Sequence, residues 1–217
     1  MGRLLLIDAL AALVLVGLWY FYFSRYNRRK GRNALQWVEA ACLNHARIVE
    51  AHWIGTSSLQ ARLRFAAHWF ENAKVTIRLL PRPLPVQWVA SHWRQQRETL
   101  TFEADIDSAP SVTMEVMRHR WVSHSNFKTV RSSHNLYVSH LSPVVLTTSS
   151  RWRQDLPPVI NTLTTSFGHN LLGVRFRPES PHLAATVDLE ALSGEDTAAE
   201  FLGVLRELAA GASKSRQ

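Results

Sequence analysis

The chain has 217 residues, a formal net charge of +8 at neutral pH, 46% hydrophobic residues and one cysteine. This length is enough for one domain with a buried core. A single cysteine excludes an internal disulfide framework and agrees with a reducing compartment, and Cys42 is interpreted as a small buried hydrophobic residue.

The positive charge is not evenly distributed. From residue 34 onward there are 19 Lys+Arg and 16 Asp+Glu, a net of +3, and the other +5 comes from six bases less Asp8 in residues 1–33. Bases beside an apolar segment are typical of a membrane boundary, where they favour anionic lipid. The charge therefore argues against a nucleic-acid partner.

Residues 4–23 form an apolar run in which Asp8 is the one charged residue. A helix of this length spans about 30 Å, the thickness of the hydrocarbon core of a bilayer. Aromatic residues end the run and five bases follow it, whereas only Arg3 and the terminal amine precede it. Both residue types prefer the membrane interface, and bases favour its cytoplasmic side. The predicted membrane-interface residues are Trp19, Tyr20, Tyr22, Arg25, Arg28, Arg29, Lys30 and Arg32.

This pattern predicts a single-pass protein of an inner or plasma membrane, with residues 1–3 outside, a basic juxtamembrane segment at 24–33 and a cytoplasmic C-terminal domain. The alternative is a cleaved signal peptide, which would have a shorter apolar stretch and a small-residue cleavage site instead of bulky aromatics. Asp8 has two interpretations as well: its carboxylate reaches outward to the interface, or it pairs with a partner helix.

A short helix is expected at residues 33–44, with Asn33 as its N-cap. The apolar period then changes to two, most clearly in residues 59–69, where Leu59, Ala61 and Leu63 fall on one side. Short turns separate the expected strands, which predicts an antiparallel meander within residues 34–122. The six predicted strands are residues 47–54, 59–69, 74–80, 86–93, 98–106 and 112–121.

The C-terminal part is expected to alternate between strands and helices. A polar linker or long loop at 123–135 precedes a β-α-β-β-α segment at 136–210, and residues 211–217 form a disordered tail. Its predicted elements are a strand within 136–146, a helix at 155–167, strands at 171–177 and 183–189, and a helix at 195–210. The fold class is therefore α+β: an N-terminal transmembrane helix followed by a mostly antiparallel β-meander domain covered by amphipathic helices.

Four histidines recur near tryptophans at the expected strand ends. His52, His68 and His92 each precede a tryptophan, and His119 lies two residues before Trp121. Two interpretations are that these histidines converge on a metal or line a pocket, or that the tryptophans fill the core while the histidines lie on the sheet surface. The second is favoured, because no HExxH motif or Cys/His pair accompanies them. No metal or cofactor is predicted.

No catalytic residue is predicted either, since the chain lacks a G-x-S-x-G motif and a glycine-rich phosphate loop. The leading hypothesis is a non-enzymatic binding or scaffold module that holds a protein partner, or a second copy of the chain, at the membrane face. The alternative is a domain that handles a lipid or small molecule, with or without catalysis, in an apolar pocket between the sheet and the C-terminal helices.

Overall fold

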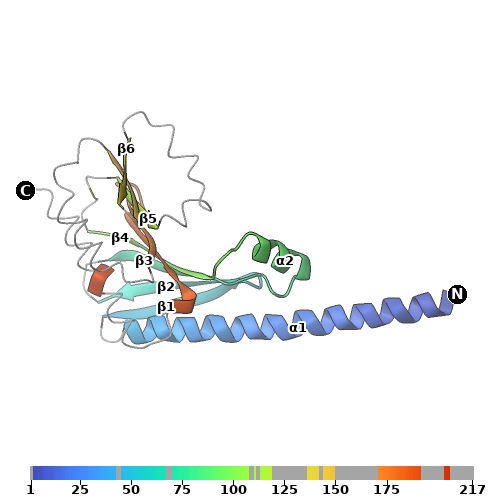
Figure 1. Cartoon of the computed structure of the whole chain (residues 1–217). Helices are drawn as coiled ribbons and strands as arrows, with labels where there is room; N and C mark the ends of the chain where they lie inside the picture. The colour runs from blue at the N-terminus through green and yellow to red at the C-terminus, as the bar shows by residue number, and fades with distance from the viewer. Residues whose placement is uncertain are drawn as a thin grey trace, which may run out of the picture.

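The computed structural model describes residues 2–42, 45–66, 70–107, 110, 113–118, 136–141, 144–149, 171–191 and 203–205. One long N-terminal helix lies along a twisted sheet and extends well beyond it (Figure 1). The helices and strands of the described residues are α1 (Gly2–Ala41), β1 (Ala46–Ile54), β2 (Ser58–Phe65), β3 (Glu71–Arg78), α2 (Pro85–Trp93), β4 (Thr99–Asp105), β5 (Met114–Arg118), β6 (Leu136–Leu141), β7 (Val144–Ser149), β8 (Leu171–Phe176), β9 (Leu183–Asp188) and the short 3₁₀ helix η3 (Leu189–Ala191).

The described strands form one nine-stranded sheet in the order β1-β2-β3-β4-β9-β8-β5-β7-β6. Every neighbouring pair is antiparallel. The first four strands follow one another as a meander. The C-terminal hairpin of β8 and β9 then lies between β4 and β5. The centre of the sheet is therefore built from strands that are far apart in the sequence.

The core lies on the central strands and beneath the second half of α1. Phe102 and Phe176 are almost completely buried, and a cluster of Phe65, Phe70 and Phe102 has ring centroids 5.2–6.2 Å apart. The last turns of α1 contribute Ala34, Trp37, Val38 and Ala41 to the same core, and Cys42 follows directly after the helix. One helix therefore serves as both the apolar N-terminal extension and a cover of the sheet.

The predicted fold class, an apolar N-terminal helix followed by a mostly antiparallel α+β domain, is confirmed. The alternation in residues 59–69 also predicts the right face, because Leu59, Ala61 and Leu63 are buried in β2. The structure has strands at both places predicted around residues 178–181, namely β8 and β9.

The predicted strand at residues 86–93 is wrong, because this segment is the helix α2. Pro85 occupies the first helical turn, where its fixed φ and missing N–H are tolerated. Alternation of Val86, Trp88 and Ala90 suggested a strand, yet nine residues are too few for period two and period 3.6 to be told apart.

The six-stranded meander is also wrong beyond its fourth observed strand. The strand that follows β4 in the chain, β5, pairs with β7 and β8 and not with β4. Alternation within one segment predicts which of its residues share a face of the sheet. It does not predict which strand from a distant part of the sequence pairs with that segment. The single strand predicted within residues 136–146 is two strands, β6 and β7.

The separate helix predicted at 33–44 does not exist, because α1 runs without interruption from Gly2 to Ala41. No proline interrupts the basic segment, and Arg and Lys are good helix formers, so nothing ends the membrane helix there. Several predicted features lie outside the described residues: His68, His119, the linker 123–135, the helix 155–167 and the tail 211–217. Of the helix at 195–210, only residues 203–205 are described; they are helical, and Leu205 is buried in the core.

Candidate membrane interface and helix–sheet junction

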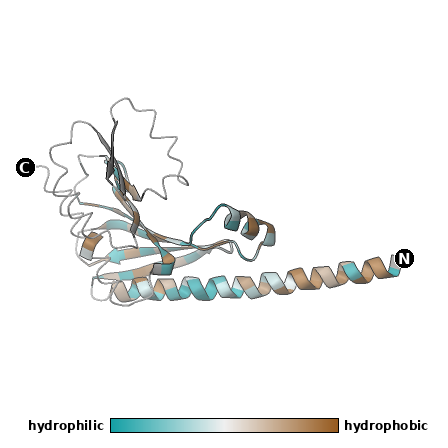
Figure 2. Ribbon diagram, viewed as in Figure 1, coloured by the Kyte–Doolittle hydropathy of each residue, from teal (hydrophilic) through white to brown (hydrophobic). Residues whose placement is uncertain are grey.

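The N-terminal half of α1 is apolar and exposed along its length (Figure 2). Among the described residues, it is the one helix long and apolar enough to cross a membrane, a test that a signal sequence also passes. An exposed apolar helix of this length indicates membrane association. At 40 residues, α1 is about 60 Å long, so roughly half of it remains to reach the sheet.

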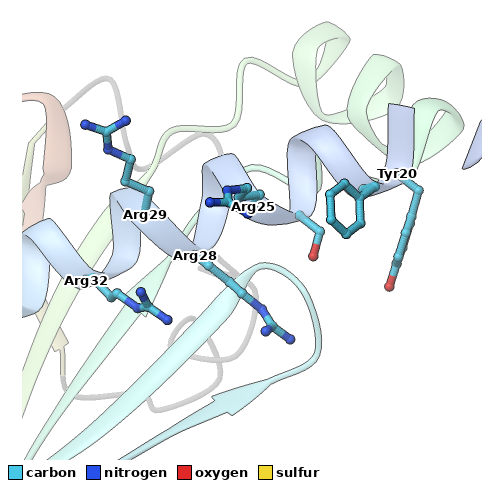
Figure 3. A pocket seen from close by; sticks show the side chains of 7 residues that line it. Tyr20, Arg25, Arg28, Arg29 and Arg32 are labelled. Carbon is cyan, nitrogen blue, oxygen red and sulfur yellow. The ribbon is translucent and has the colours of Figure 1, made fainter. Parts of the chain in front are cut away.

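The arginines of α1 form a stripe on one side of the helix (Figure 3). Arg25, Arg28, Arg29 and Arg32 are exposed, and within the described part of the chain none pairs with a carboxylate. An open groove of about 760 Å³ follows them, lined by Tyr20, Phe21, Ser24, Arg25, Arg28, Arg29 and Arg32. Because every lining residue belongs to α1, this groove is a basic helix surface and not a cleft between elements.

The other side of α1 contacts the domain just where the apolar run ends. The Trp19 indole Nε1–H donates a hydrogen bond to the Arg82 carbonyl oxygen at 3.0 Å. The rings of Trp19 and Phe23 lie 5.8 Å and 6.5 Å from that of Trp88 on α2. The last aromatic turns of the apolar helix therefore pack against the domain itself.

One turn further on, Asn27 is fully buried between α1 and two loops. Its side-chain Nδ2 donates to the carbonyl oxygens of Thr56 at 3.2 Å and Leu80 at 2.9 Å. Arg82 Nη1 donates to Asn27 Oδ1 at 3.4 Å, and the Arg82 guanidinium lies 5.1 Å from the ring centroid of Tyr26. The buried Asn27 amide is thus hydrogen-bonded at both its nitrogen and its oxygen, and it links α1 to the loops at Thr56 and Leu80.

Glu98 forms the charged centre of this junction. Its carboxylate pairs with Lys30 of α1 and with Arg82, and it accepts the Leu80 backbone N–H at 3.1 Å. The Glu98 side chain is 2% exposed, against 29% for Lys30. Burial alone would raise the pKa of Glu98, but hydrogen bonds from Lys30, Leu80 and Arg82 outweigh burial and lower this pKa below its ordinary value. Glu98 is therefore held as a carboxylate that ties helix, loop and sheet together.

A second polar cluster lies at the far end of β4. The Asp105 carboxylate accepts hydrogen bonds from Asn72 Nδ2 at 3.1 Å, Ser180 Oγ at 3.0 Å and the His182 N–H at 3.3 Å. Burial would raise the pKa of Asp105, whereas these donors and the nearby His182 ring lower it, with a net decrease. Each donor belongs to a turn or strand end beside β4. These hydrogen bonds therefore hold the neighbouring turns and strand ends against the end of β4.

The predicted interface residues divide into two groups. Tyr20, Tyr22 and the four arginines are exposed, as membrane-interface residues would be, whereas Trp19 and Lys30 face the domain. Sequence reasoning missed Asn27, Arg82 and Glu98. The sequence held no signal for them, because a single buried polar residue is recognised only when its partners from other elements are known.

The histidines contribute no common site among the described residues. His52 is half exposed on β1, with Nδ1 4.0 Å from Glu50 Oε1, while His92 lies on α2 with its ring 6.4 Å from Trp88. In the described ranges, no group of three or more His, Cys, Asp or Glu residues could hold a metal ion. Trp53, next to His52, packs against the core as expected, but the bulge at Ile48–Glu50 leaves Val49 exposed.

Comparison with known proteins gives little guidance on function. No protein-family model matches the chain, and no curated protein matches it. Among solved structures, it is similar to the crystal structure of the mycobacterial trehalose monomycolate transport factor A, with a TM-score of 0.45 and 9% identity over 85% of this chain and 94% of that one. Inferences about this chain therefore depend on its own residues.

Proposed function

We propose that this protein is a single-pass, membrane-anchored binding module whose α+β domain holds a protein partner, or a second copy of the chain, at the cytoplasmic face. The observation that carries the proposal is the continuity of α1, which runs from the exposed apolar segment into the domain core. A domain fixed to its anchor in this way is placed at a defined height and orientation above the bilayer.

The contacts at the junction support retention of the apolar segment. Trp19 and Phe23 pack on Trp88, so cleavage after the apolar run would remove part of the packing between α1 and α2. The exposed arginine stripe just after this run supports a cytoplasmic domain, because bases favour that side of a membrane.

The edge of the sheet offers a surface for the partner. β1 is a nine-residue edge strand that, within the described chain, pairs only with β2. Its Val49 and Ile54 are exposed, and Val49 lies at the bulge. An edge strand with unpaired backbone groups and exposed apolar side chains is the kind of surface on which another chain adds a strand.

The test is chemical crosslinking in native membranes, followed by mass spectrometry of the captured proteins. Residues 4–18 are replaced by an unrelated apolar helix of equal length, which leaves Trp19 and the whole junction in place. We expect the native chain and this chimera to capture the same partner. Val49→Glu should lose most of that capture, whereas Val49→Thr, which keeps the β-branched shape, should retain it.

Two results would contradict the proposal. Loss of the partner from the chimera but not from Val49→Glu would mean that the helix recognises it within the bilayer. A stoichiometric lipid or small molecule bound to the purified chain, without any reproducibly captured protein, would favour the ligand-handling alternative.

A further inference from the structure

The outer face of α2 is apolar and open to solvent. Val86, Val89 and Trp93 lie three, four and seven residues apart, so they share one side of the helix. Val86 is 83% exposed and Trp93 82% exposed. The opposite side of α2 carries Trp88, which packs against α1. Both the side of α2 that packs on α1 and the side that faces solvent therefore carry apolar residues.

The position of α2 along α1 is fixed by three contacts at the end of the apolar run. Trp88 meets Trp19 and Phe23, and the Trp19 indole donates to the carbonyl of Arg82 in the preceding loop. Of the domain elements labelled in Figure 1, α2 extends farthest toward the N-terminus of α1. In Figure 2, α2 carries residues coloured as hydrophobic, and Trp88 on α2 contacts α1 at the end of its hydrophobic half.

These contacts determine where α2 must lie when α1 crosses a bilayer. Residues 4–23 span about 30 Å as a helix, which matches the hydrocarbon core and places Trp19 and Phe23 at its cytoplasmic boundary. A segment in contact with both residues is then at the headgroup level. The exposed arginines follow within the next three turns, where anionic headgroups attract them.

We infer that α2 is a second membrane contact, in which Val86, Val89 and Trp93 enter the boundary between headgroups and acyl chains of the bilayer that α1 crosses. The inference rests on anchoring by α1 and is independent of the partner proposed for the domain. Lipid is chosen over a protein because α2 packs on the last aromatic turns of the apolar anchor, which places its exposed apolar residues at the depth of the bilayer boundary. With two contacts on the lipid, the domain is fixed in tilt as well as in position.

The experiment uses the full chain in nanodiscs of phosphatidylethanolamine and phosphatidylglycerol. Val86→Cys carries an environment-sensitive nitrobenzoxadiazole dye, Glu179→Cys in the exposed turn between β8 and β9 is the control, and Leu13→Cys reports the anchor. The native Cys42 is 1% exposed, and burial, followed by repulsion from Glu39, raises the pKa of its thiol to about 11. Its labelling is therefore suppressed, and unlabelled native chain provides the blank.

An interfacial helix buries its apolar face about 5–10 Å into the lipid boundary, so a nitroxide high on the acyl chain should remove roughly half or more of the Val86 emission. The Glu179 probe should respond to aqueous iodide and not to the lipid nitroxide. The Leu13 probe should respond to a nitroxide deep in the acyl chain. Because a dye can disturb its own site, Trp93→Cys is measured as an independent position and should behave like Val86→Cys.

Iodide quenching at Val86 and Trp93 equal to that at Glu179 would overturn the inference, because α2 would then face water. Protection from both quenchers would overturn it as well, and would mean that a second copy or another protein covers α2. If lipid nitroxides quench the Leu13 probe but not the Val86 and Trp93 probes, then α1 is in the bilayer and the proposed membrane contact of α2 is wrong. If lipid nitroxides quench none of the Leu13, Val86 and Trp93 probes, then membrane anchoring by α1 is wrong.

Discussion

Just before β4, the carboxylate of Glu98 lies between Lys30 of the membrane helix and Arg82 of the loop that precedes α2. A buried carboxylate with two cationic partners and a backbone donor is satisfied only when all of these segments are in place. Its contribution is conditional: removing Glu98 leaves two cations without their partner, which costs more than the pairs contribute to stability by themselves.

Substituting Glu98→Gln should reduce the free energy of unfolding by about 3 kcal/mol, the lower end of the range for breaking a buried ion pair, because Lys30 still reaches solvent. The measurement is denaturant unfolding of the full chain in detergent micelles. Glu103→Gln in β4 is the matched control, and substitution of its half-buried carboxylate should change stability by no more than about 0.5 kcal/mol. Equal effects of the two substitutions would show that the Glu98 pairs contribute little.

The lowered pKa of Glu98 also predicts how the stability depends on pH. A carboxyl whose pKa is lower in the folded state stabilises that state above its unfolded pKa, and this stabilisation is lost as the pH falls through the folded value. The stability difference between the native chain and Glu98→Gln should therefore be constant near neutral pH and shrink on acidification below the ordinary glutamate range. Asp105, whose pKa is also lowered, is present in both chains, so its pH-dependent contribution cancels in the difference. A difference that grows in acid would contradict this assignment.

At the scale of elements, the packing of α1 on β1 depends on a residue without a side chain. A Cβ at Gly31 would lie 2.6 Å from Cη2 and 2.9 Å from Cζ2 of Trp53. Such distances are shorter than any van der Waals contact, so the indole occupies space that only glycine leaves free. The same indole is partly buried and packs against the core cluster, so it brings the edge strand against the helix.

Gly31→Ala should destabilise the chain even though alanine is the better helix former by about 1 kcal/mol. Overpacking against a large ring typically costs about 1–3 kcal/mol, so the net loss should be about 1 kcal/mol. In a Trp53→Leu background the space is open, and Gly31→Ala should then be neutral or stabilising in thermal unfolding. Gly17→Ala is the control, since nothing lies within 4 Å of a Cβ there. Additive effects of the Gly31 and Trp53 substitutions would show that the two residues do not compete for space.

The elements also show what local patterns predict and what they do not. The alternation of Leu59, Ala61 and Leu63 predicted the buried face of β2, because the pleat of a strand is a local property. The helix α2 and the insertion of β9 beside β4 escaped prediction, because a short amphipathic segment fits both periods and strand order depends on distant residues. For the candidate site, the aromatic and basic residues near the end of the apolar run are visible in the sequence, whereas Glu98 is recognised only from the partners that the fold brings to it.

At the scale of the whole molecule, α1 joins two environments in one rigid element. Its first half is exposed and apolar, and its second half covers the sheet and contributes Trp37 and Val38 to the core. The junction at Asn27 and Glu98 lies between these halves. Because the helix has no break there, the orientation of the domain follows that of the apolar half of α1.

We expect α1 to anchor the chain in the membrane with the domain on the cytoplasmic side. The most direct measurement is labelling of a Glu179→Cys chain with a membrane-impermeant maleimide, in intact cells and in inverted membrane vesicles, together with carbonate extraction. Glu179 is exposed in the turn between β8 and β9, far along the chain from the apolar segment and away from the β1 edge proposed for the partner. We predict labelling in inverted vesicles but not in intact cells, and full-length chain that resists extraction. Labelling in intact cells, or release of a shortened chain, would contradict this topology.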